Sequence, residues 1–347
     1  MEGQIHGRSA RTNCWRSGAL LRGNGQGTSD MKALITGVAG FIGSALAREL
    51  VGSTDVELVG VDSFTPYYSR EQKESNVFPL LSAQNFEFHD GDLREVELER
   101  VLDGVDVVYH LAAQPGVRAS WGGNDFRDYV TQNVLATHRL LQAALDAGVP
   151  RVVYASSSSV YGNTPVYPTH EEVVPKPFSP YGVTKLAGEH LCTLYAENFG
   201  MNVTSLRFFT VYGPGQRPDM AIHRMIECAL DGEAFGVYGN GGHVRSFTYV
   251  ADVVDAVIRA GESGEPGDVV NVAGGSSVDM RGLVDLVSDA TGRQLKVRYG
   301  AEVAGDVKKT DGSVDRAWKS LGWRPRTELI NGLAEQVKWH LWRRGRL

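Results

Sequence analysis

The sequence has little cysteine, no long apolar run and no excess of positive charge. Its 347 residues include only three cysteines, Cys14, Cys192 and Cys228, which are too few and too scattered to predict a disulfide framework or a zinc site. No stretch approaches the roughly 20 consecutive apolar residues of a membrane-spanning helix. We therefore expect a reduced, cytoplasmic protein that neither crosses a membrane nor holds a metal ion.

The charge balance and the composition narrow the class of protein further. With 35 basic and 41 acidic side chains the formal net charge is −6, which argues against non-specific binding to nucleic acid or to an anionic membrane. A composition of 42% hydrophobic and 22% charged residues is that of an ordinary globular protein. The length of 347 residues is enough for two domains.

Residues 1–30 differ from the rest of the chain. They are rich in Gly, Ser, Arg and Asn, and their apolar run, Ala19–Leu21, is too short for the core of a signal peptide. We expect a disordered extension, with Met31 as the functional start. A transit peptide is the weaker alternative, because the segment is not convincingly amphipathic.

From Met31 onward, strand patterns alternate with helix patterns. Strands are predicted at 32–36, 57–62, 86–89, 107–111, 151–155, 203–208 and 269–272. Helices are predicted at 41–51, 127–147 and 181–199, and near 220–230, 250–260, 280–290 and 330–342. The apolar runs lack strict alternation, as in strands that are covered on both faces. The pattern predicts an α/β fold with a doubly wound parallel sheet.

A glycine-rich turn joins the first predicted strand to the first predicted helix. Gly37, Gly40 and Gly43 would permit a tight turn and let a pyrophosphate approach the free N–H groups of the helix N-terminus. Asp62 ends the second strand, 19 residues after Gly43, where an acid accepts hydrogen bonds from the adenosine ribose and repels a 2′-phosphate. These features predict binding of NAD in preference to NADP. A glycine-rich turn with Asp62 as a turn residue is the alternative.

A tyrosine and a lysine share one face of a predicted helix. Tyr181 and Lys185 are separated by one helical turn, and a lysine ammonium near a phenol favours the phenolate and lowers its pKa. A phenolate can act as general base on a sugar or alcohol hydroxyl. The serines 156–159 follow the end of a predicted parallel strand, where such sheets bind ligands. A surface pair on a helix and a polar loop are the structural alternatives.

Together these residues resemble the extended short-chain dehydrogenases/reductases, and within them the nucleotide-sugar epimerases. The resemblance runs from Met31 to about residue 340 and includes the segments Asp92-Leu93, His110 to Gln114 and Val160-Tyr161-Gly162. It implies a Rossmann-type NAD-binding domain over 31–207 and a smaller nucleotide-sugar-binding domain over 208–347. The segment 246–273 could return to the first domain. It also implies a homodimer.

The resemblance assigns roles to individual residues. It implies a catalytic triad of Ser157, Tyr181 and Lys185. The NAD-binding residues that it implies are Gly37, Gly40, Phe41, Ile42, Gly43, Asp62, Asp92, Leu93, Leu111, Ala112, Ala113, Tyr181 and Lys185. The substrate-binding residues that it implies are Ser157, Ser158, Ser159, Thr210, Arg217 and Arg245.

Two neutral residues limit which reaction of this superfamily the chain can catalyse. Dehydratases of this superfamily carry Asp-Glu where this chain has Ser158-Ser159, and serines cannot supply that acid–base pair. The glutamate often found in this region of the decarboxylases is also missing. The simplest remaining cycle is 4-epimerisation: Tyr181 removes the C4 hydroxyl proton, a transient 4-keto sugar forms, and hydride returns to its other face.

Three segments are similar to the UDP-glucuronate 4-epimerases, namely 113–118, 154–162 and 207–221. The resemblance implies interconversion of UDP-glucuronate and UDP-galacturonate, with Arg245 on the diphosphate. Val303 stands where some members have a second diphosphate arginine, so either Arg217 or Arg298 takes that role, or the phosphates are held differently. A UDP-glucose 4-epimerase, a nucleotide-4-ketosugar reductase and a non-catalytic NAD-binding regulator stay open as alternatives.

Overall fold

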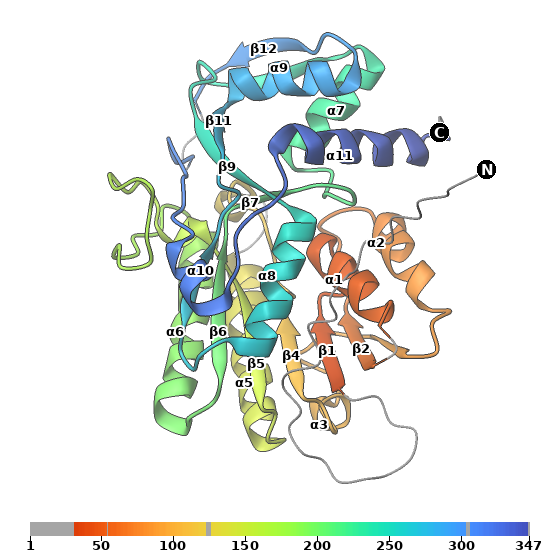
Figure 1. The fold of residues 1–347 in the computed structure, drawn as a ribbon, viewed down its shortest axis with the longest axis vertical. Helices are drawn as coiled ribbons and strands as arrows, with labels where there is room; N and C mark the ends of the chain where they lie inside the picture. The colour runs from red at the N-terminus through yellow and green to blue at the C-terminus, as the bar shows by residue number, and fades with distance from the viewer. Residues whose placement is uncertain (1–30, 54, 123–125, 303–305, 346–347) are drawn as a thin grey trace, which may run out of the picture.

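The computed structural model describes residues 31–345 except 54, 123–125 and 303–305. The predictions made for residues 1–30 and for Val303 lie outside the described residues. Figure 1 shows a parallel sheet with helices on both of its faces, and a smaller group of helices and strands beyond the carboxyl ends of its strands.

The main sheet has seven parallel strands. In spatial order they are β10 (Val269–Val272), β6 (Val203–Phe208), β5 (Arg151–Ser157), β4 (Val107–His110), β1 (Met31–Thr36), β2 (Val56–Asp62) and β3 (Phe86–Asp90). The chain order reverses between β1 and β4, as in the doubly wound sheets that bind nucleotides. The predicted strands and the α/β fold class are confirmed.

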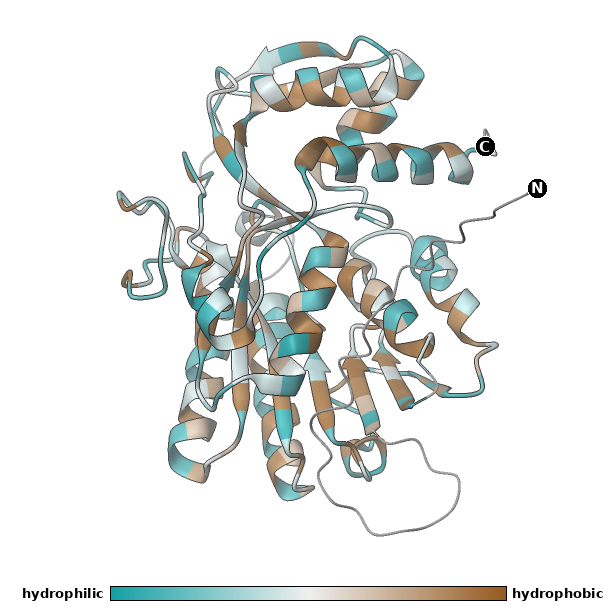
Figure 2. Ribbon diagram, in the orientation of Figure 1, coloured by the Kyte–Doolittle hydropathy of each residue, from teal (hydrophilic) through white to brown (hydrophobic). Residues whose placement is uncertain are grey.

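Helices cover both faces of this sheet because the strands are apolar on both sides, which Figure 2 shows as brown along the central strands. The helices that pack on one face are α1 (Phe41–Val51), α8 (Val250–Ser263) and α10 (Asp315–Leu321). Those on the other face are α3 (Leu98–Val101), α5 (Ala136–Asp146) and α6 (Pro180–Phe199). α2 (Arg70–Val77) and the 3-10 turn η2 (Phe78–Leu80) flank α1.

A second apolar core forms beyond the sheet. It lies among α7 (Ala221–Asp231), α9 (Met280–Thr291), α11 (Leu329–Arg343), β8 (Ala234–Tyr238), β9 (Val244–Tyr249) and β12 (Lys296–Gly300). β9 also pairs with β7 (Thr210–Tyr212) and β11 (Ser277–Asp279). Within the segment 246–273, α8 and β10 pack on or within the main sheet, whereas β9 does not. The division into two domains stays a prediction.

The helix predicted over 127–147 is interrupted, which corrects the sequence analysis. α4 (Phe126–Val130) passes through a π-helical turn, η4 (Thr131–Leu135), into α5. The wider turn lets two consecutive side chains reach different partners: Gln132 donates to Asp92, and Asn133 binds the backbone of Gln114. Such turns are frequent at functional sites. In the part of the chain that the structure describes, each helix is too short or too polar to span a bilayer.

Candidate active site

A cleft opens at the carboxyl ends of the parallel strands and brings together residues from distant parts of the chain. The predicted residues that line it are Gly37, Gly40, Phe41, Ile42, Gly43, Asp62, Leu93, Leu111, Ala112, Ala113, Tyr181, Lys185 and Arg217. The predicted residues that lie outside its lining are Asp92, Ser157, Ser158, Ser159, Thr210 and Arg245.

The glycine turn needs glycine for steric reasons at two positions. Gly37 has φ +72°, and a Cβ there would lie 2.8 Å from the backbone of Ala112. A Cβ on Gly43 would lie 2.1 Å from the carbonyl oxygen of Gly37. Gly40 precedes α1 without a side-chain cap among the described residues, so N–H groups of the first turn remain for a ligand. This cradle fits a pyrophosphate at the helix N-terminus.

Asp62 is held in the cleft by the turn that it follows. Its Oδ2 accepts a hydrogen bond of 3.0 Å from the Ala39 N–H, and its Oδ1 accepts one of 2.9 Å from the Phe64 N–H. Burial raises the pKa of its carboxyl, although these bonds and Lys73 oppose that rise. The carboxylate therefore fixes the glycine turn and retains lone pairs for a ribose hydroxyl.

The carboxylate of Asp92 binds two other side chains of the protein beside the cleft. It pairs with Arg94 at 2.7 Å and accepts a hydrogen bond of 3.1 Å from Gln132, which itself lines the cleft. Burial acts to raise the pKa of Asp92, but the bonds from Arg94 and Gln132 outweigh it and lower the pKa to about 2. Its neighbour Leu93 is the member of the predicted Asp92-Leu93 pair that lines the cleft.

Tyr181 lies in the cleft wall at the start of α6, which Ser179 caps by accepting the N–H of Gly182. The sequence predicts that Lys185 lowers the pKa of the Tyr181 phenol. The structure corrects this: burial raises that pKa, and the groups that oppose the rise are the hydroxyl of Ser157 and the charge of Arg217. Ser157 thus acts to lower the pKa of Tyr181 through its hydrogen bond, although Ser157 does not line the cleft.

The Lys185 ammonium is held by the protein at the inner wall of the cleft. Its Nζ donates a hydrogen bond of 2.6 Å to the carbonyl of Ala155 and lies 4.9 Å from the ring centroid of Tyr154. Burial lowers the pKa of Lys185 to about 8. The side chain is buried at the inner wall of the cleft, where it can donate its remaining protons to a ligand.

A buried ion pair lies behind these residues. Arg207 on β6 makes two hydrogen bonds, of 2.9 and 2.8 Å, to the carboxylate of Glu189 on α6, one turn after Lys185. Ser156, which lines the cleft, also donates to Glu189. Arg207 further donates to Tyr161, whose hydroxyl donates to Asn271 on β10. The network joins α6 to the three neighbouring strands β5, β6 and β10.

Arg217 enters the cleft from the loop after β7. Its Nε and one terminal nitrogen donate to the two oxygens of Asp219 at 2.9 and 3.0 Å, and Tyr67 donates to the same carboxylate at 3.3 Å. The guanidinium lies 5.7 Å from the Tyr67 ring centroid. Arg217 thus brings a positive charge near Tyr181. One edge of its guanidinium group is already hydrogen-bonded to Asp219.

Arg245 belongs to a second charged cluster. Its side chain donates a 2.9 Å bond to the Val244 carbonyl, and burial lowers its pKa, opposed by the charge of Asp306. The positive charge of Arg118 also lowers the pKa of Arg245, and Arg118 forms an ion pair with Asp306 at 2.6 Å. Arg118 therefore lies near Arg245, whereas Arg298 lies exposed on β12. The expectation that Arg217 or Arg298 is the second diphosphate arginine, or that the phosphates are held differently, stays a prediction.

Sequence reasoning missed the segment between β2 and α2. Thr65, Tyr67, Tyr68 and Lys73 all line the cleft. Lys73 donates to the Thr65 carbonyl at 2.6 Å and lies 4.7 Å from the Tyr68 ring centroid. The adjacent tyrosines Tyr67 and Tyr68, five and six residues after Asp62, were the available signal, because loops at the carboxyl ends of such strands carry ligand contacts.

Comparisons with known proteins agree with this geometry. Residues 33–273 match the model of the NAD dependent epimerase/dehydratase family. The chain is 40% identical to the uncharacterized UDP-glucose epimerase YtcB of Bacillus subtilis, over 88% of this chain and 97% of that protein. It is 34% identical to a UDP-glucuronate 4-epimerase of Thermodesulfobacterium geofontis, over 88% of this chain and 95% of that protein.

A solved structure is also similar. The UDP-glucuronic acid 4-epimerase of Bacillus cereus, in complex with UDP-glucuronic acid and NAD, superposes with a TM-score of 0.86. Its sequence is 38% identical, and the match covers 89% of this chain and 98% of that one.

The buried ion pair predicts a large loss of stability on substitution. Glu189→Gln keeps the shape but leaves the Arg207 charge buried without its partner, which costs about 3–5 kcal/mol in the free energy of unfolding. Chemical denaturation measures this. Glu335→Gln is the control, because Glu335 pairs with Lys338 at the surface, where such pairs contribute about 0–1 kcal/mol. Equal effects of the two substitutions would contradict the assigned role of the pair.

Proposed function

The chain belongs to the NAD dependent epimerase/dehydratase family, and we propose that it interconverts UDP-glucuronate and UDP-galacturonate by inverting C4 of the sugar. It is an NAD-dependent nucleotide-sugar 4-epimerase. The observation that carries the choice of sugar is the guanidinium of Arg217 in the wall of the cleft, acting on Tyr181.

The cleft provides separate sites for the parts of NAD. The glycine turn and the N-terminus of α1 would hold the pyrophosphate, Asp62 the adenosine ribose, and Leu93 the adenine. Leu111, Ala112 and Ala113 line the wall after β4. Lys185, whose Nζ is fixed by the Ala155 carbonyl, would donate to the nicotinamide ribose hydroxyls. When bound, oxidised NAD would supply the hydride acceptor, and its reduced form the hydride donor, for C4 of the sugar, and the oxidised form would add positive charge to the cleft.

Tyr181 and Ser157 handle the proton. In the protein alone burial keeps the Tyr181 phenol protonated, and Ser157 and Arg217 oppose that effect. A further positive charge in the complex would favour the phenolate, which takes the C4 hydroxyl proton and later returns it. Ser157, which hydrogen-bonds Tyr181, would orient the sugar hydroxyl. Ser158 and Ser159 lie outside the cleft lining and cannot supply the acids needed for dehydration.

A uronate substrate demands control of its carboxylate. A 4-keto uronate is a β-keto acid and can lose CO₂, so holding the carboxylate near the plane of the ketone would slow that loss. The edge of Arg217 that Asp219 leaves open can donate a charge-assisted hydrogen bond. Thr210, at the start of β7, would frame the same region. At the other end of the substrate, Arg245 and Arg118 would bind the diphosphate.

UDP-glucose 4-epimerisation is the second candidate. Asp219 favours it, because its carboxylate neutralises Arg217 and would repel a uronate carboxylate brought too close. The relative named a UDP-glucose epimerase supports the same alternative.

We also propose that the protein is a homodimer in the cytoplasm. α5 and α6 pack side by side, and Leu135, Val183 and Leu194 are exposed on this pair and the adjoining π-turn. Val183 and Leu194 are 11 residues apart on α6, which places them on one face of the helix. A second copy that packs against this face would bury them. The described cysteines Cys192 and Cys228 are free thiols, as suits a reducing compartment.

The proton-transfer role of Tyr181 is tested by Tyr181→Phe. The substitution removes the ionisable oxygen and keeps the ring, so turnover of UDP-glucuronate without added dinucleotide should fall by about 10²–10⁴-fold or more. Tyr195→Phe is the control on the same helix, because its hydroxyl binds Gln142 away from the cleft. Near-normal turnover by Tyr181→Phe would exclude the role. Activity that requires a continuous supply of NADPH would instead identify a 4-ketoreductase.

The choice of sugar is tested by kcat/KM for UDP-glucuronate and UDP-glucose. Arg217→Ala should reduce kcat/KM for UDP-glucuronate by about 10–150-fold more than for UDP-glucose, the value of a hydrogen bond to a charged group. Any loss that both sugars share reports the effect of the Arg217 charge on Tyr181. Arg245→Ala is the matched control and should affect both sugars alike, because both carry the diphosphate. If wild type prefers UDP-glucose, or if Arg217→Ala affects both sugars equally, the UDP-glucose assignment replaces the proposal.

The dimer is tested by charging its proposed face. Leu194→Glu should convert a dimer to a monomer in light scattering, because the glutamate would be buried without a partner. Phe78→Glu, at another exposed apolar residue on η2, should leave the dimer intact. A monomeric wild type, or a dimer unaffected by Leu194→Glu, would refute this face.

A further inference from the structure

Two buried glutamines hold the turn that precedes Arg217. The turn follows β7, and the N–H of Gln216 closes it on the carbonyl of Gly213 at 3.1 Å. Gln336 on α11 is completely buried and binds this turn twice. Its Oε1 accepts the Gly213 N–H at 2.9 Å, and its Nε2 donates to Oε1 of Gln216 at 2.8 Å. One side chain of α11 therefore fixes both the beginning and the end of the turn.

The amide group of Gln216 is bound at both of its polar atoms. Its Oε1 also accepts the backbone N–H of His223 at 3.0 Å, and its Nε2 donates to the carbonyl of Val211 at 2.9 Å. Because a backbone N–H only donates and a carbonyl only accepts, these partners fix the orientation of the amide, and the Gly213 N–H does the same for Gln336. A buried polar network whose members are satisfied in this way is rigid and specifies one geometry.

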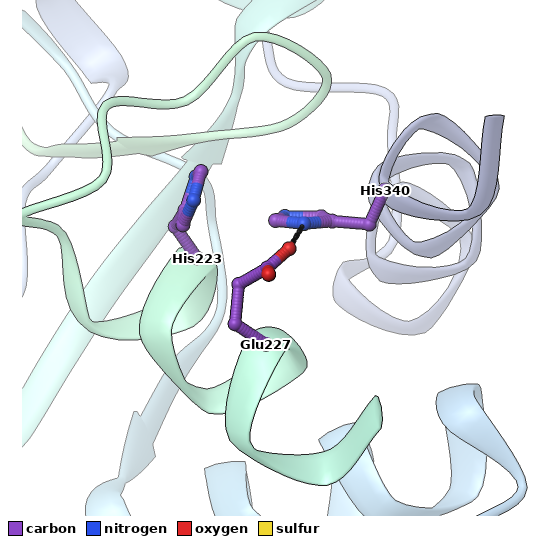
Figure 3. A group of neighbouring side chains, drawn as sticks. All are labelled: His223, Glu227 and His340. Atoms are coloured by element: carbon purple, nitrogen blue, oxygen red, sulfur yellow. Dashed lines mark hydrogen bonds and ion pairs between the residues drawn. The ribbon is translucent and has the colours of Figure 1, made fainter. Parts of the chain in front are cut away.

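The backbone carbonyl of Gln216 is bound as well. It accepts a hydrogen bond of 2.8 Å from Nδ1 of His223 on α7, and Nε2 of Gln72 on α2 lies 3.5 Å away. Figure 3 shows the ring of His340 directed from α11 toward the side chains of α7, and its centroid lies 4.5 Å from that of His223. Arg217 thus follows a residue that three helices hold in place.

Arg217 itself is held only from the other side of the chain among the described contacts. Two nitrogens of its guanidinium donate to Asp219, and its backbone carbonyl accepts the N–H of Met220. The direction from which the side chain enters the cleft therefore depends on the turn before it. A guanidinium forms a charge-assisted hydrogen bond to a carboxylate only when its N–H groups are aligned with the oxygens. A neutral hydroxyl at C6 of a hexose would depend much less on this alignment.

We propose that Gln336 and Gln216 are positioning residues that set the preference of the enzyme for a uronate sugar. The inference rests on the proposed function, in which Arg217 binds the carboxylate of the substrate. Neither glutamine lines the cleft, so both act through the placement of Arg217 and not through contact with the sugar. The choice of sugar thus depends on α11, a helix of the second core.

The test is a double-mutant cycle between Gln336→Met and Arg217→Ala in the full chain. Methionine is similar in length to glutamine but cannot form the two amide hydrogen bonds. The readout is kcat/KM for UDP-glucuronate divided by kcat/KM for UDP-glucose, a ratio from which the fraction of folded protein cancels. Gln336→Met should lower this ratio by about 10-fold or more, since a misplacement of about 1 Å can cost about 100-fold. In the Arg217→Ala background it should not change the ratio further.

Leu283→Ala is the matched control. Leu283 on α9 is completely buried in the same core, and its truncation lowers stability without removing a hydrogen bond of the turn. This variant should melt at a lower temperature than wild type and keep the wild-type ratio. Gln216→Met removes the same contact from its other side and provides the second reading if Gln336→Met yields no active enzyme.

The outcomes separate this inference from the proposed function. The positioning role is overturned if Arg217→Ala lowers the ratio but neither glutamine variant does. It is also overturned if the glutamine variants lower the ratio equally in the Arg217→Ala background, or if Leu283→Ala lowers it as much. If Arg217→Ala leaves the ratio unchanged, the assignment of the sugar fails, and the positioning role fails with it.

Discussion

The buried ion pair between Glu189 and Arg207 holds α6, the helix that carries Tyr181 and Lys185, against the sheet. It attaches α6 to β6 from inside the protein, one helical turn after Lys185. Through Ser156 the same carboxylate holds the end of β5, and through Tyr161 and Asn271 the network reaches β10. Removing two charges from water is costly, and fully satisfied hydrogen bonds offset that cost only in one geometry. Because Tyr181 and Lys185 lie on the same helix as Glu189, this geometry also fixes their positions.

Positive charge is distributed at two ends of the proposed substrate site. Arg217 lies with Tyr67 and Asp219 beside Tyr181, whereas Arg245 lies with Arg118 and Asp306. Each arginine has an acidic partner, so neither is an isolated buried charge. A nucleotide-sugar with negative charge at both ends, a diphosphate and a uronate carboxylate, matches this arrangement. An uncharged hexose would use only one end of it.

Much of the fold could be predicted because its signals are local in sequence. The run of apolar residues at 203–208 and the glycine turn after β1 each specify their own structure, and the strand and helix that they predict are present. The π-helical turn at 131–135 could not be predicted, because it depends on partners such as Asp92 and Gln114 that approach only after folding. The pKa of Tyr181 was predicted in the wrong direction for a similar reason: spacing places Lys185 on the same face of the helix, but burial, which depends on the folded surroundings, raises the pKa of Tyr181.

The sequence by itself determined the parallel sheet and the glycine cradle, because their signals lie in the spacing of residues along the chain. The set of Ser157, Tyr181 and Lys185 came from a resemblance, and its catalytic role stays a proposal. Only the tertiary structure decided which side chains from distant segments meet. Arg118, which follows β4 in the chain, lies near Arg245 on β9, and the ring of His340 on α11 packs against that of His223 on α7. These contacts depend on how helices and strands from distant parts of the chain pack together. The spacing of side chains within one helix or strand does not say which other element will pack against it.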